Sequence, residues 1–148
     1  MTHPLLALQA ADTSAQQLRH RREHLAEHDA LAAAEQALAA GERDVARVEQ
    51  RIAELNAEIE ADEARGHQLT ASRTRLEAQL RTVIAIREAE AIQHELASLA
   101  TERDALDDAE LAALEEQAAL DDQLVVLNAR LPGLRQGQLD AEAARDAA

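Results

Sequence analysis

The segment VARVEQRIAELNAEI, residues 45–59, carries branched aliphatic residues at alternating spacings of three and four: Val45, Val48, Ile52, Leu55 and Ile59. That spacing places all five side chains on one face of an α-helix, and it is the a/d pattern of a coiled coil. The same register extends from residue 31 to residue 83. The stretch therefore predicts a long helix that packs along a second one.

A second a/d series, again in one register, begins at Ile92 and ends at Leu134. Because the two series are separated only by a short segment, we expect the chain to turn there and pair the two helices in antiparallel order. A register with Leu76 facing Leu96 aligns the two series along their length. The predicted fold is all-α, with a long antiparallel coiled-coil hairpin over residues 30–148 and its tip at about residues 83–88.

Polar residues interrupt both series near the middle of the arms. The predicted register brings Asp62 beside Glu110. Two interpretations are open: Arg103 or Arg73 neutralises the two carboxylates, or the middle of the hairpin is a frayed, hydrated waist.

Pro132 marks a weak point in the second helix. Its nitrogen has no hydrogen to donate and its ring clashes one turn back, so we expect this helix to kink or end near Leu131. The register puts Gly41 on the other arm at the same level.

Residues 1–29 are predicted to form a separate unit. Pro4 suits the first turn of a helix, and Leu5, Leu8, Leu18 and Leu25 follow one helical stripe. We expect a short N-terminal helix packed at the base of the hairpin, either within one chain or between two chains of a homodimer. Residues 27–29 contain neither glycine nor proline, so a continuous helix is the open alternative.

The composition favours a rod and excludes several kinds of chemistry. The 148 residues hold 15 basic residues, all arginine, against 29 acidic ones, and the net charge is −14. Lysine, cysteine and the three large aromatic residues are absent, which excludes Schiff-base, P-loop and thiol chemistry. We expect a non-enzymatic protein without a cofactor. The acidic charge and the lack of stacking side chains disfavour nucleic acid as a partner of this segment.

The chain shows no sign of a membrane segment or a signal sequence. Its apolar runs are far too short for either, and its first residues lack a basic region. A cytoplasmic protein without membrane contact is the expectation.

Three histidines, His20, His24 and His28, recur at every fourth residue, and residues 24–28 match the H-x-x-E-H pattern of one zinc peptidase group. Three interpretations are open: a zinc hydrolase, a structural or adventitious metal site, and a solvated polar face. Hydrolysis also needs a further ligand and an enclosed cleft, so a solvated face is the preferred interpretation.

The predicted tip is the strongest candidate for a contact surface. Val83, Ile84 and Ile86 fall where neither arm would cover them, beside Arg87 and Glu88. Exposed apolar groups at the end of a rod indicate a partner. The alternative is that Val83 and Ile86 close the tip on themselves. We expect an adaptor or scaffold that binds a protein partner through its tip, its base or both.

The residues that follow the tip resemble a known family. The matching motifs are Arg87-Glu88, the block Gln93-His94-Glu95-Leu96 with Ser98-Leu99, and Leu106-Asp107-Asp108 with Glu110-Leu111. They resemble bacterial coiled-coil proteins that carry a C-terminal four-cysteine zinc ribbon, are predicted to bind nucleic acid and include flagellar chaperones of the sigma-54 factor.

This resemblance implies a coiled-coil hairpin, and it adds Gln93, His94 and Glu95 to the candidate partner surface. Ala85-Ile86 stands where the family has Asn-Pro, and the chain has no cysteine for a ribbon. The ribbon is thus either missing from this chain or lost in this relative, and its metal and nucleic-acid binding do not carry over. The implied alternative function is a transcription-associated or nucleic-acid-associated factor without its ribbon.

Overall fold

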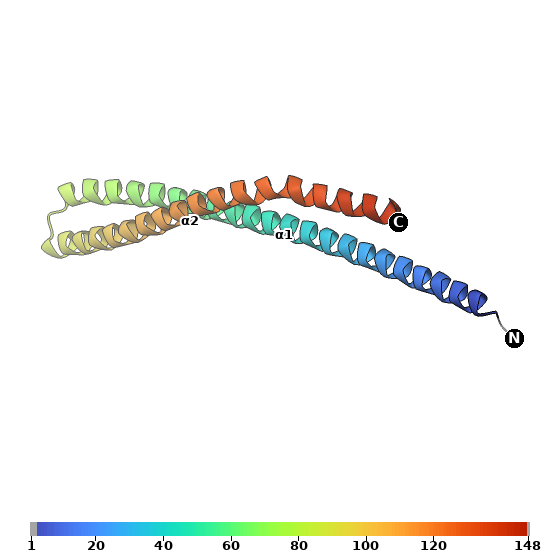
Figure 1. Cartoon of the computed structure of the whole chain (residues 1–148). Coiled ribbons are helices and arrows are strands. Elements are labelled where there is room, and N and C mark those ends of the chain that lie inside the picture. The colour runs from blue at the N-terminus through green and yellow to red at the C-terminus, as the bar shows by residue number, and fades with distance from the viewer. Residues whose placement is uncertain (1–2, 148) are drawn as a thin grey trace. The chain divides into compact units, whose positions relative to one another are not determined.

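The computed structural model describes residues 3–147, and two helices make up nearly all of them. Helix α1 spans Pro4–Thr82 and helix α2 spans Ile86–Ala147, with residues 83–85 between them (Figure 1). Alanine, leucine, glutamate and arginine are strong helix formers, and the a/d series gives each helix a face to bury. The predicted all-α coiled-coil hairpin is confirmed.

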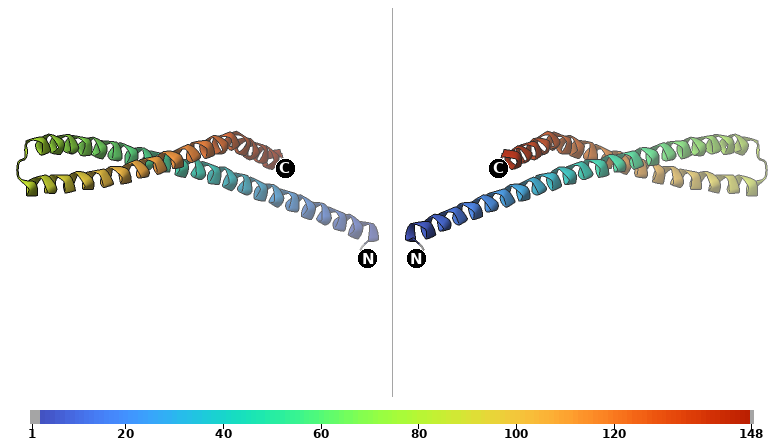
Figure 2. Two further views of the ribbon diagram at one scale, coloured as in Figure 1. Left: turned by 90° about the vertical axis from the view of Figure 1, so that its left-hand side faces the viewer. Right: turned by 90° about the vertical axis from the view of Figure 1, so that its right-hand side faces the viewer.

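The chain divides into two compact units. Residues 47–124 form the first, which we call the tip unit; residues 3–46 together with 125–147 are the described part of the second, which we call the base unit. Figure 2 shows the tip unit's antiparallel helix pair from two further directions.

Buried side chains of the tip unit all come from the predicted seam. They are Val48, Leu55, Leu69 and Leu76 of α1 with Ile92 and Ala113 of α2. The amide of Gln117 donates to Asn56 on the other helix, which is one position from the pairing that the predicted register gives. The a/d interpretation is therefore confirmed for this unit.

Charge also specifies the antiparallel pairing in the tip unit. Residues 64–87 hold five arginines and one glutamate, whereas residues 88–110 hold eight carboxylates and one arginine. The two stretches lie against each other, and Arg65 Nη2 approaches Glu102 Oε1 at 2.6 Å. Because a basic stretch faces an acidic one, this pairing is favoured over pairing of like stretches.

The polar residues that interrupt the two a/d series do not pair as the first interpretation predicts. Arg103 donates to the carbonyl oxygen of Gly66 at 3.0 Å and to Asp107 at 3.1 Å, while Arg73 pairs with Glu77. Neutralisation of Asp62 and Glu110 by these arginines is therefore wrong. Both carboxylates are only half-buried, so solvent screens their repulsion.

In the base unit, Leu31 and Val45 of α1 and Leu131 of α2 are buried. A Cβ atom at Gly41 would lie 2.8 Å from Leu134 Cδ1 and 3.3 Å from Leu131 Cδ2. Gly41 thus allows two leucines of α2 to approach the backbone of α1 closely, which confirms that it faces the region of the proline.

Helix α2 continues through Pro132 to Ala147. The expected end of this helix near Leu131 is therefore not observed. An interior proline costs about 3 kcal/mol through a lost hydrogen bond and a steric clash. Leu131, 8% exposed, is buried directly beside it, and this burial offsets part of that cost.

The separate N-terminal helix is also not observed. Helix α1 runs without interruption from Pro4 through residues 27–29, where no residue breaks a helix. Leu5, Leu8, Leu18 and Leu25 are 69%, 62%, 64% and 63% exposed, so they do not pack onto the base within this chain. The expectation of a short helix docked there is wrong for the described residues, and residues 1–2 lie outside them.

Candidate functional site

The tip consists of a three-residue connection between the helices, which contains one exposed isoleucine, and the start of α2, which contains a second. Helix α1 ends at Thr82, whose hydroxyl donates to the carbonyl oxygen of Gln79 at 3.0 Å. The amide of Ala89 donates to the carbonyl oxygen of Ala85 at 3.1 Å and so starts α2. Ile84 is 98% exposed and Ile86 is 75% exposed. The connection is therefore held by local hydrogen bonds, while its largest side chains face solvent.

The interpretation in which the tip closes on itself holds for only one residue. Val83 is half-buried, in line with its seam position at the end of α1. Ile86 is exposed beside Ile84, and Arg87 and Glu88 are exposed as well. The structure thus brings Val83, Ile84, Ile86, Arg87 and Glu88 together at one end of the hairpin.

The tip carries positive charge in an acidic protein. Residues 78–87 contain Arg81 and Arg87 and no carboxylate. Both arginines are exposed, and neither forms an ion pair within the part of the chain that the structure describes. Glu88 lies in the first turn of α2, where a negative charge is stabilised by the helix dipole. The surface is therefore apolar at its centre and cationic on both sides.

Gln93, His94 and Glu95 are exposed on α2 but stand back from the tip. At 1.5 Å of rise per residue, His94 lies about 12 Å along the helix from Ile86. Its side chain borders a shallow depression with Ala97 and Ser98. These three residues form a flank of the tip rather than part of its apolar centre.

The histidines are arranged as a ladder along α1. The rings of His20 and His24 are stacked with centroids 6.4 Å apart, and those of His24 and His28 meet edge to face at 4.5 Å. The Nε2 atoms of His24 and His28 lie 3.1 Å apart, within hydrogen-bond distance, and the tautomers of the two rings set which nitrogen donates. Within residues 3–147, no group of three or more side chains is placed to hold a metal ion. A metal role for these residues stays a prediction that rests on the pair alone.

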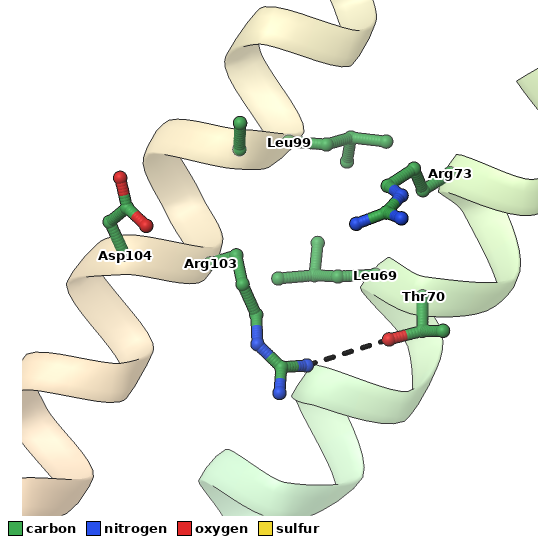
Figure 3. A pocket seen from close by; sticks show the side chains of 7 residues that line it. Leu69, Thr70, Arg73, Leu99, Arg103 and Asp104 are labelled. Atoms are coloured by element: carbon green, nitrogen blue, oxygen red, sulfur yellow. Dashed lines mark hydrogen bonds between the residues drawn. The ribbon is translucent and has the colours of Figure 1, made fainter. Parts of the chain in front are cut away.

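A pocket between the helices of the tip unit was not predicted from the sequence. It has a volume of about 320 Å³ and is lined by Leu69, Thr70, Arg73, Leu99, Ala100, Arg103 and Asp104. Figure 3 shows Arg103 reaching from α2 towards Thr70 on α1, with Leu69 and Leu99 between the helices. The signal in the sequence was a pair of arginines at seam positions, which leave room that leucines would fill.

This pocket has little free binding capacity. Arg103 already bonds to Asp107 and to the backbone of Gly66, and Arg73 already bonds to Glu77. Both guanidinium groups are therefore already bonded to other residues of the coiled coil. We interpret the pocket as a polar break in the seam.

Arg51 is the centre of the largest ion-pair network among the described residues. It bonds to Glu116 across the helices at 2.8 Å and to Glu54 and Glu58 on its own helix at 3.3 and 3.2 Å. The hydrogen bonds from Arg51 lower the pKa of Glu116, and the bond to Glu116 in turn raises the pKa of Arg51. The network thus holds α1 and α2 together at a point where both helices are acidic and would otherwise repel each other.

Comparison with known proteins identifies one family. The CT398-like coiled coil hairpin domain matches residues 8–148 of the chain. The comparison of this chain with curated proteins and with solved structures found no match. In the part of the chain that the structure describes, neither helix is long and apolar enough to cross a membrane.

Proposed function

Since the chain belongs to the family of CT398-like coiled coil hairpin domains, we propose that it is a non-enzymatic adaptor that binds a protein partner through its tip. All-helical hairpins of this kind are typical of proteins that hold or space other proteins. The observation that carries the proposal is the exposure of Ile84 at 98% beside Ile86 at 75%. Contact with a partner would remove this apolar surface from water.

The charges around the two isoleucines indicate what kind of partner surface fits. Arg81 and Arg87 flank the apolar centre, so a complementary surface has an apolar pocket with carboxylates at its rim. Along α2, the acidic residues 88–110 would repel the same rim. The charge distribution therefore favours contact with the end of the hairpin over contact with the α2 side of the arms.

A second candidate is a protein that docks on transcription machinery, as the zinc-ribbon family suggests. The exposure of Gln93, His94 and Glu95 favours it, because this block carries the resemblance. In that function too the hairpin would contact protein, since a net charge of −14 opposes binding to phosphates.

The two candidates are separated by variants of the tip and of its flank. Immobilised wild type, Ile84→Asp and His94→Ala chains are used to capture partners, and each captured protein is then purified and its affinity measured. Leu111→Asp is the control, because Leu111 is 57% exposed on α2 away from the tip.

We expect Ile84→Asp to weaken binding of the purified partner by about 100-fold, which corresponds to loss of one well-buried hot-spot residue. The control should bind as the wild type does. Undiminished binding by Ile84→Asp would refute the tip as the contact surface. A loss confined to His94→Ala with a component of the transcription machinery would favour the second candidate.

A further inference from the structure

The N-terminal segment, residues 4–28 of α1, presents an apolar stripe that this chain leaves uncovered. Leu5, Leu8, Leu18 and Leu25 are each more than 60% exposed, and Ala11 and Ala15 lie between them at helical spacing. A helix with one apolar face in water is not stabilised by its own hydrogen bonds alone. We therefore expect another apolar surface to pack against the stripe.

Helix α2 of the same chain is on the wrong side to be that occupant. The seam that packs against α2 includes Leu31 and Val45, and its register continues backward through Glu27, His24, His20, Gln17 and Thr13. Counted in steps of seven residues from His24 and Gln17, Ala11, Leu18 and Leu25 lie one residue later in this register, and Leu8 and Ala15 lie five residues later. At about 100° per residue, its centre points about 150° away from the seam.

The charge distribution indicates the chemistry of the occupant. Residues 4–28 hold three arginines and three carboxylates, whereas residues 29–124 hold nine arginines and 23 carboxylates. The whole net charge of −14 therefore lies outside the N-terminal segment. Two copies of the chain repel each other along their arms but not along this segment, and a strongly charged partner gains nothing from it.

We propose that the N-terminal segment pairs in antiparallel order with the same segment of a second copy of this chain. In the stripe, Leu8, Ala15 and Arg22 occupy a positions, and Ala11, Leu18 and Leu25 occupy d positions. Antiparallel pairing puts each a position against a d position of the other copy. The layers are then Leu8 with Leu25, Ala15 with Leu18, and Arg22 with Ala11, each occurring twice.

This register is self-complementary, as a two-fold interface requires. The one polar layer pairs Arg22 with the small Ala11, which leaves room for the aliphatic stem of the arginine while its charged end reaches water. The same register brings Asp12 of one copy beside Arg19 of the other, again twice. Both residues are exposed in the single chain, and neither has an ion pair among residues 3–147.

The first test is the mass of the full chain in solution, measured by sedimentation equilibrium over a range of concentrations. We expect a dimer, and we expect Leu18→Glu to weaken dimerisation by at least about 100-fold, because it places a carboxylate in two apolar layers. Leu111→Glu is the matched control, since Leu111 is 57% exposed on α2 outside the segment. A monomeric wild type, or a Leu18→Glu variant that dimerises as the wild type does, would overturn the proposal.

A second test distinguishes this dimer from one formed elsewhere or in parallel order. Because the chain has no cysteine, disulfide cross-linking reports only on introduced thiols. The Leu8→Cys/Leu25→Cys variant should cross-link under oxidation, whereas Leu8→Cys alone should not. Efficient cross-linking of Leu8→Cys alone would show parallel order and refute the register.

Charge reversal examines the same register without changing apolar surface. Asp12→Arg should weaken dimerisation by about fivefold, in the range of exposed ion pairs. The double variant Asp12→Arg/Arg19→Asp should restore it. Equal weakening by the single and the double variant would contradict the pairing of these two residues.

Discussion

Truncation of Leu55 is the sharpest test of the seam. Leu55 is 1% exposed and lies in the tip unit, where α1 packs on α2. Replacement by alanine removes three carbon atoms from this site. Transfer of those atoms out of water is worth about 2.4 kcal/mol, taking about 0.8 kcal/mol for each.

The cavity left behind adds to this loss. In globular cores the total for Leu→Ala is about 2.7–5 kcal/mol, depending on how far the surroundings collapse. A seam between two helices is bounded by solvent on its sides, so its neighbours can relax and the total falls near the lower end. We expect Leu55→Ala to lower the free energy of unfolding by about 3 kcal/mol. That is equivalent to a fall in Tm of about 6–12 °C for a chain of this length.

The assay is urea and thermal unfolding followed by far-UV circular dichroism, with all chains at the same concentration. Leu111→Ala is the control, because Leu111 is 57% exposed. Its truncation should cost no more than about 0.5 kcal/mol. The reasoning would be refuted if the two substitutions destabilised the protein equally, because burial in the seam would then not be what holds the helices together.

Two further predictions concern charge and backbone. Arg51→Gln should lower stability at neutral pH, and the difference from wild type should shrink as the pH falls below 4.5, the ordinary pKa of Glu116. The pKa of Glu116 is lowered in the folded state, so its contribution is present at high pH and is lost on protonation; a difference independent of pH in urea titrations would contradict this. Gly66→Ala should raise stability by about 0.5 kcal/mol, since alanine favours the helix and the flexible end of Arg103 can move aside. Gly41→Ala should instead lower it by about 1 kcal/mol, because a leucine methyl 2.8 Å away is packed in the seam; equal shifts in Tm would refute the contrast.

The sequence by itself determined the paired parts of the two helices and their register. An a/d series is a local property, so the paired stretch and its buried face follow from spacing alone. The ends of the helices did not follow in this way, because α1 begins at Pro4 and α2 continues past Leu131. Leu55 and Leu76 could be assigned to the seam in this way, and both are buried. The residues of the tip could also be named, because the turn must lie between the two series.

The sequence also left open two local choices that depend on contacts. Pro132 stays within α2 because burial of neighbouring side chains in the seam offsets the local cost of a proline inside a helix. Arg103 turns to the backbone of Gly66 because the missing side chain there leaves space for the guanidinium group. Spacing predicts which residues of the two helices lie opposite each other, but not the rotamer of a side chain or the group to which it bonds.

The tertiary structure alone decided that the apolar stripe of the N-terminal segment is left uncovered. The stripe of Leu8, Leu18 and Leu25 has the same helical spacing as the seam, yet it is exposed, whereas Leu55 is buried. Both patterns form helix equally well, because helix formation depends on local backbone bonds. Burial depends on whether a second helix lies on that side, and that is fixed by where the two arms meet rather than by any short stretch of sequence.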